Sequence, residues 1–94
     1  AETFMAKWCV ARTLRALDKL DEALKIQFAL LEEMIESDKA DGYVYEELGE
    51  IHLLKNEEVY KMYFNMAWHE LKEDVWLSKH EQERLNRIKK LSEQ

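Results

Sequence analysis

The chain has 94 residues, of which 47% are hydrophobic and 36% are charged, and its formal net charge is -6. This length and composition predict one soluble globular domain, residues 1–94, that buries a modest core without a metal or a cross-link. The single cysteine excludes an internal disulfide, and there is neither a signal-peptide pattern nor the roughly 18-residue apolar run of a membrane span. We therefore expect a cytoplasmic protein that does not contact a membrane.

The first two helices are predicted from apolar residues that recur at three- and four-residue steps. The first should cover about residues 2–17 and the second about residues 21–37, with a polar break at Asp18 and Lys19 between them. The abundance of Ala, Leu, Glu, Lys and Met, with two glycines and no proline, favours helices throughout and leaves little room for a sheet. The fold class is therefore predicted to be all-α.

Two further helices follow a polar loop. The third is expected over about residues 42–54, with Asp41 as its N-cap. The fourth is expected over about residues 57–74, with Asn56 in the same role. An aspartate or asparagine immediately before an apolar-periodic segment is the expected signal for such a helix start.

A fifth helix is predicted at the C-terminal end. Ser78 and Glu81 form an S-x-x-E capping box, which predicts a helix over about residues 78–92 with Leu85 and Ile88 turned inward. Five helices with short loops form either stacked hairpins or a compact helical bundle.

The charge is distributed unevenly along the chain. Residues 79–94 hold 5 basic and 3 acidic side chains, whereas the preceding body is strongly acidic. An acidic body argues against a nucleic-acid partner, because binding to a phosphate backbone needs clustered lysine and arginine side chains. The basic stretch RLNRIKK, residues 84–90, is expected to be a solvated helix end whose cations favour the helix macrodipole.

The third and fourth predicted helices carry a recognisable motif. On the third helix it consists of the aromatic Tyr45, then Leu48 and Gly49, and then the ring of His52 three positions later. On the fourth helix two aromatic residues, Tyr60 and Phe64, stand four positions apart. The first hairpin has Ala11 at the small position, followed by the start DEAL of its second helix. These features resemble the tetratricopeptide repeat, a helix-turn-helix unit with the pattern W-x2-L-G-x2-Y, then A-x3-F, then P.

The resemblance implies two degenerate repeats, over about residues 4–37 and 41–74, stacked as a short right-handed superhelix and closed by a capping helix over about 78–92. In that family the small residue lets the paired helices approach closely, which would compensate the roughly 1 kcal/mol that Gly49 costs in a helix interior. The closing proline is absent, Tyr60 is large where alanine is typical, and Gln27 replaces an aromatic residue. The plain helical bundle therefore stays open as the alternative.

The resemblance also implies a function, which is protein-protein interaction without catalysis. In this family the first helix of each hairpin lines a groove that holds a peptide or a partner segment. The residues at those positions are Met5, Trp8, Arg12 and Arg15 on the first helix and Tyr43, Glu46, Glu50 and Leu53 on the third. The arginines would hold a carboxylate and the glutamates would favour a basic segment. The alternative is that Trp8 belongs to the core and both arginines are solvated.

A second hypothesis is a helical oligomerisation or scaffold element. Val59, Met62 and Met66 lie on the fourth predicted helix, opposite its main apolar stripe. Three clustered apolar side chains form a protein interface unless the fifth helix covers them, and a symmetric homodimer is the commonest use of such a surface.

The inventory of chemical groups predicts no enzyme, no metal and no cofactor. The histidines His52, His69 and His80 never stand four residues apart, which is the spacing of a helical zinc pair. Cys9 has no histidine near it in sequence and is expected to be a small, half-buried hydrophobic residue rather than a nucleophile.

Overall fold

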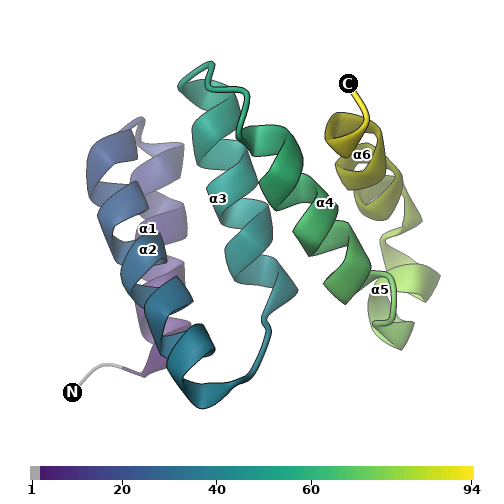
Figure 1. Ribbon diagram of the computed structural model, residues 1–94, viewed down its shortest axis with the longest axis horizontal. Helices are drawn as coiled ribbons and strands as arrows, with labels where there is room; N and C mark the ends of the chain where they lie inside the picture. The colour runs from purple at the N-terminus through teal and green to yellow at the C-terminus, as the bar shows by residue number, and fades with distance from the viewer. Residues whose placement is uncertain (1–2) are drawn as a thin grey trace. The chain divides into compact units, whose positions relative to one another are not determined.

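The computed structural model describes residues 3–94 and consists of helices and their connections within that range, which confirms the all-α prediction. The six helices of this described part are α1 (Phe4–Ala16), α2 (Leu20–Ser37), α3 (Gly42–Leu54), α4 (Tyr60–Leu71), α5 (Val75–His80) and α6 (Gln82–Ser92) (Figure 1). No helix among these residues combines the length and the apolar character that a membrane crossing requires.

The chain divides into two compact units. The first ends at Ala40 and is the α1–α2 hairpin, while the second covers Asp41–Gln94 and contains α3 to α6. The boundary falls between the two predicted repeats, and the predicted capping helix belongs to the second unit. A tetratricopeptide-like stacking of the two units stays a prediction.

The α1–α2 hairpin begins at Thr3, whose side-chain oxygen accepts a hydrogen bond from the backbone N–H of Ala6 at 3.1 Å. The predicted start at Glu2 lies outside the described residues. Ala11 on α1 and Ala23 on α2 are both fully buried. The two helices are also joined by Lys7 and Glu33, whose Nζ and Oε2 atoms are 3.4 Å apart on the surface.

Three helices end in the same way, at an aspartate or asparagine with left-handed backbone. These residues are Asp18 after α1, Asp38 after α2 and Asn56 after α3, with φ of 63°, 55° and 60°. Asn and Asp tolerate this conformation better than other residues with a side chain, although glycine is the commoner choice at a helix end. The prediction that Asn56 caps the next helix is therefore wrong. Asn56 closes α3, and α4 begins three residues later than predicted, at Tyr60, without a side-chain cap.

The predicted fifth helix is divided in two, and its capping box is not formed. Asp74 is the N-cap of α5, since its Oδ1 accepts a hydrogen bond from the backbone N–H of Leu77 at 3.0 Å. Ser78 lies inside α5, and its hydroxyl donates to the carbonyl of Val75. Glu81 separates α5 from α6 with non-helical φ and ψ of -134° and 49°. The Glu81 carboxylate accepts a hydrogen bond from Arg84 at 2.7 Å. This carboxylate, which the capping box would require at the helix start, is therefore bound to Arg84 instead.

The helices α3 and α4 pack closely because α3 offers no side chain at two points of contact. A Cβ added to Gly49 would lie 2.9 Å from Cδ1 of Phe64, and one added to Gly42 would lie 2.6 Å from Cγ of Leu71. The two glycines are seven residues apart on α3, and Phe64 and Leu71 are seven residues apart on α4, so the two contacts lie about two helical turns from each other. The predicted reason for Gly49 is therefore confirmed. Gly42 has the same role, although the sequence indicated only that it begins a helix.

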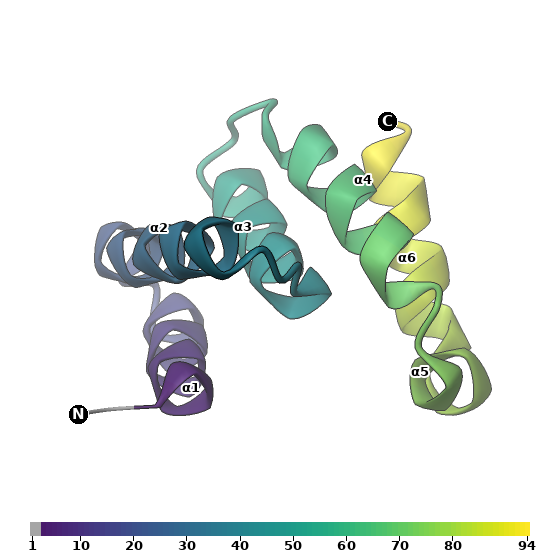
Figure 2. The ribbon, with the colours of Figure 1, turned by 60° about the horizontal axis from the view of Figure 1, so that its bottom comes forward.

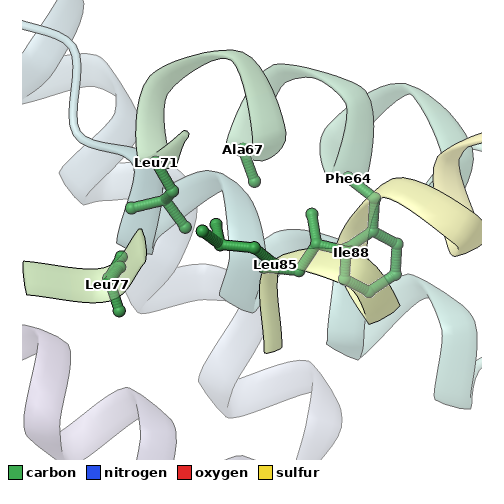
Figure 3. Close-up of a cluster of buried hydrophobic side chains, with 6 residues drawn as sticks. All are labelled: Phe64, Ala67, Leu71, Leu77, Leu85 and Ile88. Atoms are coloured by element: carbon green, nitrogen blue, oxygen red, sulfur yellow. The ribbon is translucent and has the colours of Figure 1, made fainter. Parts of the chain in front are cut away.

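One buried hydrophobic cluster of the second unit lies between α4, α5 and α6 (Figure 3). It joins three residues of α4 to one of α5 and two of α6: Phe64, Ala67, Leu71, Leu77, Leu85 and Ile88. The inward orientation predicted for the last two is confirmed, since they are 4% and 0% exposed. Figure 2 shows α4 and α6 running side by side, with α5 at one end of the pair.

Candidate interaction surfaces

The first glutamate predicted for a binding groove on α3 is held by α6. Glu46 accepts hydrogen bonds from Nε of Arg84 at 2.9 Å and from its Nη2 at 2.5 Å. The Glu46 side chain is 7% exposed and that of Arg84 is 33% exposed. A buried carboxylate is tolerated only when a cation or several donors compensate it, and a bidentate guanidinium supplies both. The hydrogen bond to Glu46 raises the pKa of Arg84 above its already high ordinary value.

The second predicted glutamate is held in the same manner, one helical turn along. Glu50 accepts hydrogen bonds from Nη1 of Arg87 at 2.5 Å and from its Nη2 at 3.1 Å. This pair is more exposed, at 50% for the Arg87 side chain and 17% for the Glu50 side chain. The two arginines of α6 therefore match the two glutamates of α3 turn by turn, and this double ion pair clamps one helix to the other.

The other two residues predicted on α3 also face inward. Tyr43 and Leu53 are half-buried and pack against the core of the second unit. The guanidinium carbon of Arg84 lies 5.3 Å from the centre of the Tyr43 ring, within the range of a cation–π contact. Burial raises the pKa of Tyr43 above 10.0, and the carboxylate of Asp74 adds to the rise. The surface on which a basic peptide was expected is thus engaged with the chain's own basic helix.

The four residues predicted on α1 are placed differently. Met5 is 67% exposed and Arg12 is also exposed, whereas Trp8 and Arg15 are half-buried. The guanidinium carbon of Arg12 lies 5.8 Å from the centre of the Trp8 ring, so the two side chains form a cation–π pair. The residues Met5, Trp8 and Arg12 follow one another at three and four positions and therefore share a face of the helix. We call this the Trp8 face.

The apolar residues predicted for self-association extend from the N-cap of α4 to the middle of the helix. Val59 is 38% exposed, Met62 is 49% exposed and Met66 is half-buried. Leu54, at the end of α3, is 56% exposed. The last helix therefore leaves Val59 and Met62 substantially exposed, although it packs against α4.

A further surface, which the sequence analysis missed, surrounds Trp68 on α4. The ammonium groups of Lys72 and Lys89 lie 4.6 Å and 5.1 Å from the centre of the Trp68 ring. One lysine follows α4 and the other belongs to α6, so this contact joins two segments distant in sequence. The i, i+4 spacing of Trp68 and Lys72 was available as a signal for half of it.

The buried histidine His52 is engaged in structural contacts. Nδ1 of His52 lies 2.9 Å from a carboxylate oxygen of Glu57, and its ring stacks on Tyr63 with the centres 5.3 Å apart. Both contacts fix the turn between α3 and α4.

Within residues 3–94, no three His, Cys, Asp or Glu side chains are grouped so that they could hold a metal ion. Cys9 is exposed rather than half-buried, which corrects the expectation from its apolar neighbours.

The chain was also compared with known proteins. No family model, no curated protein and no solved structure matches it.

Proposed function

We propose that the chain is a non-enzymatic protein-interaction module of tetratricopeptide-like helix hairpins, working in the cytoplasm without a cofactor. In this proposal the Trp8 face of α1 binds an acidic, partly apolar segment of another protein. The exposed thiol of Cys9 suits a reducing compartment. The α1–α2 hairpin and the close approach of α3 and α4 at Gly49 support the resemblance to that family.

The observation that carries the proposal is the composition of the Trp8 face. Tryptophan, arginine and methionine are the residue types enriched at the centres of protein interfaces. Here they stand together on one helix face, with the guanidinium of Arg12 already stacked on the Trp8 ring. Such stacking reduces the side-chain freedom that binding would otherwise have to restrict.

The sign of the partner's charge follows from the helix that carries this face. Between Phe4 and Ala16 there are three basic side chains, Lys7, Arg12 and Arg15, and no acidic one. An acidic segment would therefore meet complementary charge at α1. A basic segment at α3 would instead have to displace Arg84 and Arg87, which already hold the two glutamates.

The test is selection from a random peptide library displayed on phage. Wild-type protein should enrich peptides that combine Asp or Glu with apolar residues, and the double variant Met5→Glu, Arg12→Glu should lose them. The control is Lys25→Glu, which makes the same charge change as Arg12→Glu on an exposed position of α2 and should retain the same peptides. Failure to enrich any peptide family, or equal binding by the double variant, would contradict the proposal.

A second candidate function is self-association through α4, as a symmetric homodimer. It is favoured by the exposure of Val59 and Met62, and Leu54, five residues before Val59 in the chain, is exposed as well. Sedimentation equilibrium of the wild type and of Met62→Glu distinguishes the two functions. A dimer that dissociates in Met62→Glu but not in Met5→Glu, Arg12→Glu would favour the scaffold element.

A further inference from the structure

The α1–α2 hairpin carries two largely apolar and largely exposed strips whose spacing is the same. On α1 the strip consists of Ala6, Val10, Thr13 and Leu17, and on α2 it consists of Leu24, Phe28, Leu31 and Ile35. In both cases the steps are four, three and four residues, which is the spacing of the seam of a coiled coil. We call these the α1 strip and the α2 strip.

Both strips are accessible. On the α1 strip, Val10 is 44% exposed and Leu17, which caps the helix, is 62% exposed. On the α2 strip, Phe28 is 37% and Ile35 is 70% exposed, and the two leucines are half-buried. Single exposed apolar residues are ordinary on a protein surface, but two regular seams on one hairpin are not scattered residues.

The two helices also carry opposite charge. α1 has three basic residues and no acidic one, whereas α2 has five acidic residues and only one lysine, Lys25. The α2 strip is bordered by Asp21 one turn before Leu24 and by Glu32 one turn after Phe28. The α1 strip is bordered by Lys7 one turn before Val10, and its surface ion pair with Glu33 is exposed enough to exchange partners at little cost.

We propose that the α1 strip of one copy of this chain docks on the α2 strip of a second copy. A second copy fits as the occupant because the two strips share one spacing, both are accessible, and the borders of one are basic while those of the other are acidic. Like strips should not pair, since α2 against α2 would bring acidic borders together and α1 against α1 would bring basic borders together. Each contact therefore joins unlike strips. Two such contacts between the same two copies would close a two-fold dimer, and single contacts that repeat from copy to copy would generate rings or open chains.

The test uses two variants that each destroy one strip. In wild-type protein kept under reducing conditions, because Cys9 is exposed, the mean mass by sedimentation equilibrium should rise between about 10 µM and 1 mM. Val10→Glu and Ile35→Glu should each stay at the monomer mass over this range. Both positions are exposed, so circular dichroism should show unchanged helix content.

The decisive measurement is the equimolar mixture of these two variants. Val10→Glu keeps an intact α2 strip and Ile35→Glu keeps an intact α1 strip, so the mixture should form a 1:1 dimer and nothing larger. Met62→Glu, a matched change on α4, should associate like the wild type. A wild type that stays monomeric, a mixture that does not associate, or an association lost in Met62→Glu instead would each overturn the proposal.

Discussion

The pair of Glu46 and Arg84 provides the sharpest test of how α6 is held. Replacing Arg84 by methionine keeps the length of the apolar stem but leaves the carboxylate of Glu46 buried without its guanidinium. Removing one partner of a fully buried ion pair costs about 3 to 5 kcal/mol. Because the Arg84 side chain is 33% exposed, water can partly replace it, and we expect a loss of about 2 kcal/mol in the free energy of unfolding.

The matched control is the neighbouring pair on the same two helices. Arg87→Met removes an equivalent bidentate contact to Glu50, but this arginine side chain is 50% exposed. We therefore expect Arg87→Met to cost no more than about 1 kcal/mol. The double variant Glu46→Gln, Arg84→Met should be more stable than Arg84→Met alone, because it removes the uncompensated buried charge.

The assay is urea unfolding followed by far-UV circular dichroism, with the denaturant slope compared among variants because the two units need not unfold together. Equal losses for Arg84→Met and Arg87→Met would refute the reasoning from burial. A double variant no more stable than Arg84→Met would show that the uncompensated carboxylate is not the cause of the loss.

Three further predictions concern stability. Gly49→Ala should destabilise by about 1 kcal/mol in the same assay, because the strain of a Cβ against the buried Phe64 ring exceeds the gain in helix propensity; a stabilised variant would contradict the close approach. Gln27→Met should stabilise by about 1 kcal/mol in thermal unfolding, since Gln27 is fully buried with neither amide atom hydrogen-bonded in the described structure, and a loss would reveal a hidden partner. The free energy of unfolding should fall as pH rises above 10, because burial raises the pKa of Tyr43, Tyr45 and Tyr63 in the folded state. These tyrosines keep their protons in the folded protein while the unfolded chain loses them. Phenylalanine variants at these positions, measured across pH 9 to 11, should show a weaker fall.

Much of the fold follows from local signals in the sequence. Apolar periodicity predicts α1 to α4 within a few residues, and Asp41 caps α3 as expected, with its Oδ1 accepting from the backbone N–H of Tyr43 at 2.9 Å. The errors arise where one residue type has two local uses. Asn56 suits a helix start and a left-handed helix end equally well. The hydrogen bonds from the N–H of Asn56 to the carbonyl of Leu53 and from the N–H of Glu57 to the carbonyl of His52 decide for the latter.

The surfaces were harder to predict because their partners are distant in sequence. Periodicity correctly places Glu46 and Glu50 on one face of a helix, but it does not indicate what covers that face. The complementary signal was present as two arginines three residues apart, Arg84 and Arg87, which match two glutamates four residues apart. The prediction of a solvated, basic helix end therefore missed that Arg84 and Arg87 are the partners of Glu46 and Glu50.

The arrangement of charge by helix also reverses what the net charge implies about partners. A chain of net charge -6 suggests a basic partner. On α3, however, Glu46 and Glu50 are already neutralised by α6, while α1 carries only cations.

An acidic segment bound at the Trp8 face would therefore experience local attraction within a few ångströms and overall repulsion at longer range. Salt screens charges separated by more than about 8 Å at physiological ionic strength, so it should weaken the long-range repulsion more than the contact at Arg12. Between about 0.01 and 0.15 M salt, the affinity for an acidic peptide should therefore hold or rise, and a steep fall would indicate that the binding site is a wider basic surface than this one helix face.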